Sequence, residues 1–224
     1  MHRKTGKKIK LFFYSLLIII LTSTNNYDFN SQNIFNIKYI DVNGFSKKKN
    51  QLIKNQIKKI HNENILFIKK NHFSKLMNRN DTKYLYIKKN FPNRLIVNFT
   101  PSKPLCLIEI KNDKIILGDN GKILRNHIIE KTVPIVLGSD NISYIYYVVN
   151  LLNKSNLDYE IIKKIIFFKS GRFDVNLNNG VIIKFPINFN QDIINYSNNL
   201  LNKRKFAEAK IIDLRIKNKI IKYE

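Results

Sequence analysis

Apolar positions between residues 34 and 102 predict a small module in which two helices pack on a three-stranded sheet. The expected order is strand, helix, helix, strand, strand, over residues 34–42, 46–60, 71–77, 84–87 and 95–99. Apolar residues recur at helical spacing in the first helix, which predicts a buried face made of Leu52, Ile53, Ile57 and Ile60. Pro101 and Pro104 then interrupt the pattern, so we expect the module to end near residue 102.

Shorter apolar runs separated by turn residues predict a mostly antiparallel β domain over residues 103–224. Strands are expected over residues 105–110, 114–117, 122–124, 133–138, 161–168, 173–177, 181–185 and 210–223. Helical spacing returns over 142–152 and 191–201, which predicts two helices in this domain. We expect the last strand to leave one edge of the sheet free, and the fold class to be α+β.

The first 27 residues predict a membrane anchor. Residues 1–10 carry five basic side chains and no acid, and no charged residue follows until Asp28. The uncharged stretch 11–27 spans about 25 Å as a helix, the short end of the transmembrane range. Its main apolar residues are Leu11, Phe12, Phe13, Leu16, Leu17, Ile18, Ile19, Ile20 and Leu21. The charge distribution predicts a cytoplasmic tail over residues 1–10 and an exported chain beyond the anchor.

A cleaved signal peptide is the alternative for this segment. Its densest apolar part, residues 11–21, has the length of a signal-peptide core. The segment Thr22-Ser23-Thr24 lacks the alanine that is usual at a cleavage site, which favours an uncleaved anchor. Both alternatives export the rest of the chain.

The net charge of +24 suggests nucleic acid at first, but its make-up argues against that partner. Of the 40 basic residues, 33 are Lys, whereas Arg is the residue that binds phosphates in a bidentate manner. Lys, Ile and Asn share A/T-rich codons and are all abundant, so coding bias accounts for much of the excess. The sequence therefore leaves open an exported basic surface that binds an anionic polymer or lipid headgroups, and nucleic acid is not expected.

No group of residues points to catalysis. The four His residues show no metal-binding spacing, and the sequence contains no nucleophile elbow, phosphate loop or dinucleotide fingerprint. Cys106 lies between two leucines, as a buried and unreactive thiol would. We expect a non-enzymatic protein without cofactor, metal or small-molecule substrate.

Several local strings, in this order, resemble motifs of the bacterial cell division protein family FtsQ/DivIB. They cover residues 37–44 (IKYIDVNG), 91–97 (FPNRLIV), 119–121 (DNG), 134–138 (PIVLG), 172–180 (RFDVNLNNG) and 212–215 (IDLR). The order of elements is also similar to the family: basic tail, one anchor, a POTRA module at 34–102 and a β domain at 103–224. Phe173 stands where the family usually has Trp.

The resemblance implies a scaffold of the division machinery in the inner membrane at the septum. In the family, the C-terminal part of the β domain binds the small coiled-coil partners FtsB and FtsL. An unpaired sheet edge can bind such a partner by strand addition. The residues expected to bind here are Arg215, Ile216, Asn218, Ile220, Lys222 and Tyr223. A different POTRA protein, such as a secretion component, is the remaining alternative.

Overall fold

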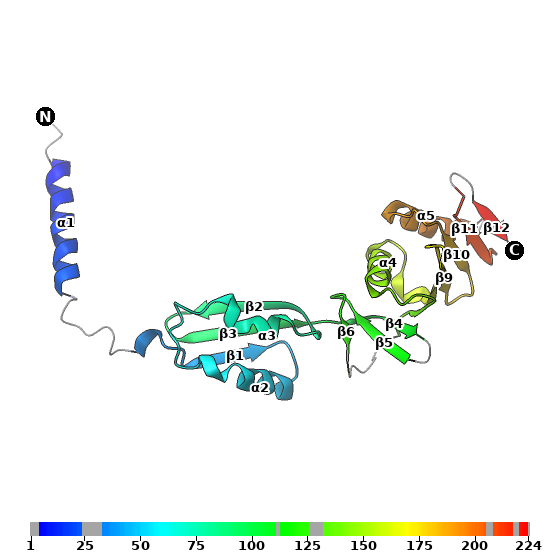
Figure 1. Cartoon of the computed structure of the whole chain (residues 1–224). Helices are drawn as coiled ribbons and strands as arrows, with labels where there is room; N and C mark the ends of the chain where they lie inside the picture. The colour runs from blue at the N-terminus through cyan, green and yellow to red at the C-terminus, as the bar shows by residue number, and fades with distance from the viewer. Residues whose placement is uncertain are drawn as a thin grey trace.

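The computed structural model describes residues 5–23, 33–110, 113–125, 132–204, 208–216 and 220–223. It contains an N-terminal helix, a three-stranded sheet with its helices and a nine-stranded sheet with two helices (Figure 1). Two separate groups of buried apolar residues underlie the two sheets, one between Ile37 and Phe99 and one between Leu105 and Leu214. The α+β class is therefore observed.

The N-terminal helix α1 (Thr5–Ser23) includes the nine apolar residues of the predicted anchor. Their side chains are 43–74% exposed. No helix among the described residues is both long enough and apolar enough to cross a membrane. The charged residues Lys7, Lys8 and Lys10 occupy part of α1, which shortens its apolar portion. The predicted transmembrane helix over 11–27 is therefore not found in the described part of the chain, and residues 24–27 lie outside that part.

The first module has the predicted arrangement of two helices on a three-stranded sheet. Strand β3 is central, parallel to β1 and antiparallel to β2, in the order β1-β3-β2. The elements are β1 (Tyr39–Asn43), α2 (Lys47–Gln56), α3 (Ser74–Met77), β2 (Thr82–Asn90) and β3 (Arg94–Pro101), with short 3-10 turns at η2 (Asn33–Phe35), η3 (Lys58–Ile60) and η4 (Lys70–Phe73).

Two details of this module differ from the prediction. The segment 34–38 is not a strand, because Asn36 bonds back to Asn33 through both backbone and side chain and closes a 3-10 turn. Leu52 is 57% exposed, whereas Ile53, Ile57 and Ile60 are buried as predicted.

The second sheet is mixed, with five antiparallel and three parallel pairings in the order β12-β11-β10-β9-β8-β7-β4-β5-β6. Its strands are β4 (Pro104–Ile110), β5 (Asp113–Gly118), β6 (Ile123–Leu124), β7 (Ile135–Leu137), β8 (Ile162–Phe167), β9 (Phe173–Leu177), β10 (Ile182–Phe185), β11 (Ile211–Asp213) and β12 (Ile221–Tyr223). Its helices are α4 (Ile142–Lys154) and α5 (Gln191–Leu201), with a 3-10 turn at η5 (Tyr159–Ile161). The prediction of a mostly antiparallel sheet with two helices holds.

The prediction of one long final strand from Lys210 to Tyr223 is wrong. The chain instead forms two short strands, β11 and β12, which pair with each other in antiparallel fashion. The Asp213 carboxylate accepts the backbone N–H of Arg215 at 3.0 Å, so this donor is taken by a side chain at the end of β11. Such a local bond turns the chain out of the strand.

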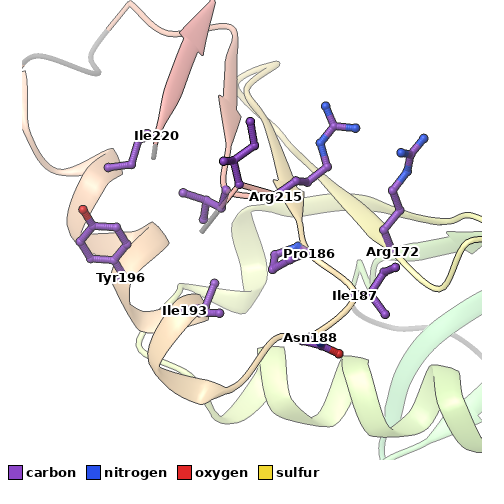
Figure 2. A pocket seen from close by; sticks show the side chains of 10 residues that line it. Arg172, Pro186, Ile187, Asn188, Ile193, Tyr196, Arg215 and Ile220 are labelled. Carbon is purple, nitrogen blue, oxygen red and sulfur yellow. The ribbon is translucent and has the colours of Figure 1, made fainter. Parts of the chain in front are cut away.

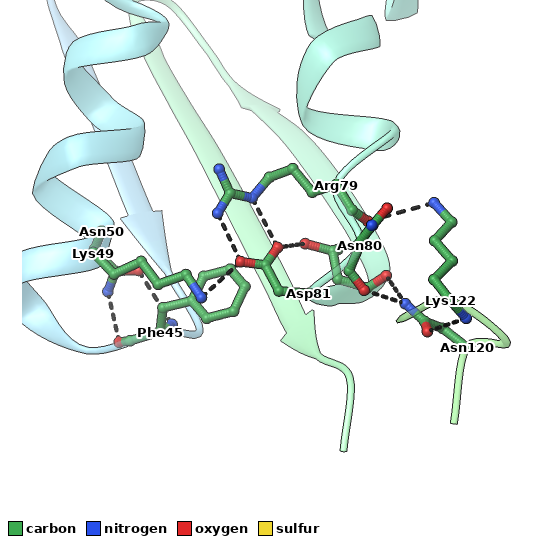
Figure 3. Close-up of polar contacts among 9 residues, drawn as sticks. Phe45, Lys49, Asn50, Arg79, Asn80, Asp81, Asn120 and Lys122 are labelled. Atoms are coloured by element: carbon green, nitrogen blue, oxygen red, sulfur yellow. Dashed lines mark hydrogen bonds and ion pairs between the residues drawn. The ribbon is translucent and has the colours of Figure 1, made fainter. Parts of the chain in front are cut away.

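A polar network joins the two modules through the turn between β5 and β6. The Asp119 carboxylate accepts hydrogen bonds from Lys83 Nζ and Ser102 Oγ, both at 2.8 Å. The Asn120 amide donates to the backbone carbonyls of Asn80 at 2.7 Å and Thr82 at 2.9 Å (Figure 3). The turn is thereby bonded to the start of β2 in the neighbouring module.

A second carboxylate supports the same end of the first module. Asp81 binds Arg79 through two hydrogen bonds of 2.7 and 2.9 Å and binds Lys49 Nζ at 2.7 Å (Figure 3). Partial burial acts to raise the pKa of Asp81, but the bonds from Arg79 and Lys49 outweigh it and lower this pKa to about 2. Partial burial and the bond from Lys83 oppose each other in the same way at Asp119, whose pKa is lowered overall.

Replacing Asn120 with Ala is expected to loosen the connection between the modules without unfolding either core. The variant loses both amide bonds to the Asn80 and Thr82 carbonyls, which removes about 1–3 kcal/mol from the contact. Two spin labels, at K88C and K163C, should report a broader distance distribution in N120A than in the parent chain.

The matched control is N178A, because the Asn178 amide donates to the backbone carbonyl of Glu160 and this bond lies wholly within the second module. It should leave the distribution unchanged, and an N120A distribution as narrow as this control would contradict the prediction. Lowering the pH should broaden the distance distribution of the parent chain as N120A does. The pKa of Asp119 is lower in the folded chain than in the unfolded chain, so its bonds stabilise the junction above the ordinary Asp pKa. That contribution is lost as the pH falls through the pKa of Asp119 in the folded chain.

Candidate functional site

A groove of about 960 Å³ opens beside the C-terminal end of the nine-stranded sheet (Figure 2). Segments from four places in the sequence line it: the residue before β9, the loop after β10, helix α5 and the segment between β11 and β12. Its exposed apolar side chains are Ile187, Tyr196, Ile216 and Ile220. Because these residues come from separate segments, the groove forms only in the folded chain.

Local sequence determines how α5 contributes to the groove. The Asn190 side chain caps the helix by accepting the N–H of Ile193 at 3.0 Å. Ile194, Ser197 and Leu200 are buried on the core side of α5. Ile193 and Tyr196 are three residues apart and share the neighbouring face, which lines the groove.

Two arginines line the groove (Figure 2). Arg215 Nε lies 2.8 and 3.0 Å from the two carboxylate oxygens of Asp213, whose side chain is only 3% exposed. The hydrogen bond from Arg215 lowers the pKa of Asp213 despite its partial burial, so this ion pair keeps the guanidinium in place at neutral pH. Arg172 packs over the ring of Phe168, 4.9 Å from the ring centroid.

Three buried polar atoms on β9 and the residue before it have no hydrogen-bond partner among the described residues. They are Arg172 Nε, Asp174 Oδ1 and Asn176 Oδ1, at alternate positions and therefore on one face of the strand. Burial raises the pKa of Asp174, although the charges of Lys184 and Arg215 oppose this. Buried polar atoms are normally paired in folded proteins, so this face beside the groove has unused bonding capacity.

The sheet ends at β12. Among the described strands, β12 pairs with β11 alone, so its outer side has no neighbouring strand. Ile220 precedes β12 and lies in the groove, which makes the groove and the strand edge neighbours. A strand edge with an adjoining apolar groove can bind an extended segment through both backbone and side chains.

The residues predicted to bind a partner fall into three groups. Arg215, Ile216 and Ile220 line the groove. Lys222 and Tyr223 belong to β12, where Tyr223 is 47% exposed. Asn218 lies outside the described residues. Ile216 and Ile220 do not lie on a strand, because β11 ends at Asp213 and β12 begins at Ile221, so the single strand expected to carry these residues does not form.

The sequence did not identify Arg172, Ile187 and Tyr196 as lining residues. Arg172 belongs to one of the strings that carry the family resemblance, and this was the available signal for it. Tyr196 lies just outside the apolar stripe of α5. No feature of the sequence placed the loop residue Ile187 near β12.

Cys106 is fully buried, and burial raises the pKa of its thiol to about 12. The thiolate form is therefore disfavoured at neutral pH, in keeping with the unreactive thiol expected from its apolar neighbours.

No protein-family model and no curated protein matches this chain. Among solved structures, the chain is similar to the major extracytoplasmic domain of the trans isomer of the bacterial cell division protein DivIB from Geobacillus stearothermophilus. The match has 15% sequence identity and a TM-score of 0.34, and covers 42% of this chain and 85% of that one.

Proposed function

We propose that this chain is a non-catalytic scaffold of the bacterial cell-division machinery that captures a segment of another division protein at its C-terminal edge. The observation that carries the proposal is the outer side of β12, which pairs with no other described strand and lies next to an apolar groove. The cell-division context is supported by the order of the two modules along the chain and by the six local strings that resemble FtsQ/DivIB.

The groove defines the chemistry of the partner segment. An extended segment would pair with β12 through backbone hydrogen bonds and place apolar side chains against Ile187, Ile216 and Ile220. Arg215 is already bound to Asp213, whereas Arg172 lines the groove and forms no ion pair with a carboxylate among the described residues. An acidic residue of the partner would therefore bind the Arg172 guanidinium. These features fit an apolar segment with at least one carboxylate, such as the FtsB-like or FtsL-like partners that the resemblance implies.

The location is part of the same proposal. The nine apolar residues of α1 are exposed and follow a basic N-terminal segment. We place α1 at the inner membrane and the rest of the chain on its periplasmic side, at the division septum.

Co-purification from membranes tests the capture. A tagged wild-type chain should retain division proteins, and the double variant I216E/I220E should retain at least about tenfold less, because each Ile that no longer buries its side chain costs about 1.5–3 kcal/mol. The matched control is L52E/M77E, since Leu52 and Met77 are 57% and 50% exposed on the other module.

Both double variants should unfold at the temperature of the parent chain. The proposal is wrong if the wild-type chain retains no division protein, or if I216E/I220E retains as much as L52E/M77E.

A further inference from the structure

One end of the three-stranded module is built from three segments that are distant in sequence. The backbone N–H of Ile65 donates to the carbonyl of Phe35 at 2.8 Å. Lys89, near the β2–β3 turn, donates through Nζ to the carbonyl of Leu66 at 3.1 Å. The turn η2, the loop 64–68 and the β2–β3 turn therefore meet. This end is opposite the junction with the nine-stranded sheet, since the junction contacts the start of β2 and this end contains its last residues (Figure 1).

All three segments expose large apolar side chains at this end. Phe67 is 73% exposed, Phe91 55%, Leu66 49%, Ile34 41% and Phe35 38%. We call these five residues the apolar tip. Their side chains lie outside the buried core of the module, which is formed by other residues.

Exposed lysines lie next to the segments of the apolar tip along the chain. They are in η3, in η4, near the end of β2 and immediately before β1 and η4: Lys38, Lys58, Lys59, Lys69, Lys70 and Lys88. Two acids lie near them: Asp41, which forms an ion pair with Arg94 at 3.1 Å, and Glu63, whose carboxylate lies 3.5 Å from His72 Nε2. The six lysines outnumber these two acids. The tip is therefore apolar at its centre and strongly positive around it.

We propose that the apolar tip docks on an anionic lipid bilayer. Phenyl and aliphatic side chains would enter the interfacial layer, while the lysines would bind lipid phosphates with their ammonium groups. A negatively charged membrane surface attracts such a basic cluster, whereas a neutral bilayer does not. An apolar protein groove would match the exposed apolar side chains but not the lysines, and a soluble polyanion would match the lysines but not the apolar side chains. A charged membrane surface matches both.

The length of the chain before the module supports this occupant. Residues 24–32 join α1 to η2, so Asn33 lies at most roughly 35 Å from Ser23. If α1 lies on or in a bilayer through its exposed apolar residues, the tip stays within reach of the same surface. Docking at the tip would place the junction, at the other end of the module, away from the lipid.

The absence of tryptophan from the sequence allows a direct test. The full-length variant F67W carries a single Trp at the tip, and the matched control Y84W carries one near the opposite end of β2, where Tyr84 is 65% exposed. Each variant is mixed with vesicles of phosphatidylcholine alone or with one-third phosphatidylglycerol, in which some lipids carry brominated acyl chains. We expect blue-shifted emission and strong bromine quenching for F67W on the anionic vesicles, and little change for Y84W.

Charge reversal gives the second measurement. In the F67W background, K69E/K70E/K88E should raise the concentration of anionic lipid needed for half-maximal quenching by more than about tenfold. Each lysine near the membrane surface contributes several-fold to the affinity. The control K47E/K48E/K163E changes three exposed lysines away from the tip and should behave like the parent. Any of four results would overturn the proposal. They are the absence of vesicle binding, equal quenching of F67W and Y84W, equal quenching on both kinds of vesicle, and equal effects of the two triple variants. Lipid is the only partner in these mixtures, so the outcome is independent of division-protein capture.

Discussion

Replacing Phe173 with Ala should lower the free energy of unfolding of the nine-stranded sheet by about 3–5 kcal/mol, the usual range for a buried Phe. The Phe173 side chain is fully buried at the centre of an aromatic group. Its ring centroid lies 4.9 Å from that of Phe185 in a stacked arrangement and 4.8 Å from that of Phe189 in an edge arrangement. Removing the ring leaves a cavity beside Phe185 and Phe189, and a cavity that the surrounding residues fill only in part adds to the loss of stability.

Denaturant unfolding followed by circular dichroism measures this effect. The control is F168A, five residues earlier, because Phe168 is 36% exposed and its truncation opens no enclosed cavity. F168A should change the free energy by less than about 1 kcal/mol. Similar losses for the two variants would show that the aromatic group does not stabilise the sheet.

Elements with a strong internal period could be predicted from the sequence. Helices α4 and α5 begin at Ile142 and Gln191, the positions expected from their apolar spacing, and Asn141 and Asn190 cap them. The three-stranded sheet was also predictable, because apolar residues recur at every second position of its central strand, where Leu95, Val97 and Phe99 are buried. In these segments local spacing and tertiary burial agree.

The errors come from side-chain bonds that the hydrophobic pattern does not contain. The apolar residues from Ile211 to Tyr223 are compatible with one strand, but the Asp213 carboxylate binds both the backbone and the guanidinium of Arg215 and ends β11. In α2, packing on the sheet covers Ile53 as predicted but leaves Leu52, at the border of the buried face, exposed. Patterns of apolar residues indicate which segments form elements more reliably than they indicate where an element ends.

The candidate site was predictable in its C-terminal part only. Arg215, Ile216 and Ile220 could be identified because they are close in sequence to the last strand. The opposite wall of the groove depends on β9, the loop after β10 and α5 folding beside that strand. This arrangement is set by strand order, with β10 parallel to β11, and strand order is not encoded in local spacing.

Gly138 offers a test of a different kind, because it combines a left-handed backbone with close packing. Its φ of +83° is costly for residues with a side chain, and a Cβ there would overlap the carbonyl oxygen of Phe167 on the neighbouring strand β8. We expect G138A to destabilise the nine-stranded sheet by more than the ~1–2 kcal/mol that a left-handed conformation alone costs an L-residue.

Gly180 separates the two contributions. It has a φ of +89°, and a Cβ there would meet no atom within 4 Å. G180A should therefore lose only the conformational part, about 1–2 kcal/mol, in the same denaturant titration. If G138A lowers the free energy of unfolding clearly more than G180A does, the difference comes from the Phe167 carbonyl. That carbonyl must move to make room for the Cβ, which weakens the pairing between β7 and β8. Equal losses would mean that backbone conformation alone explains why glycine follows β7 in the segment Pro134–Gly138.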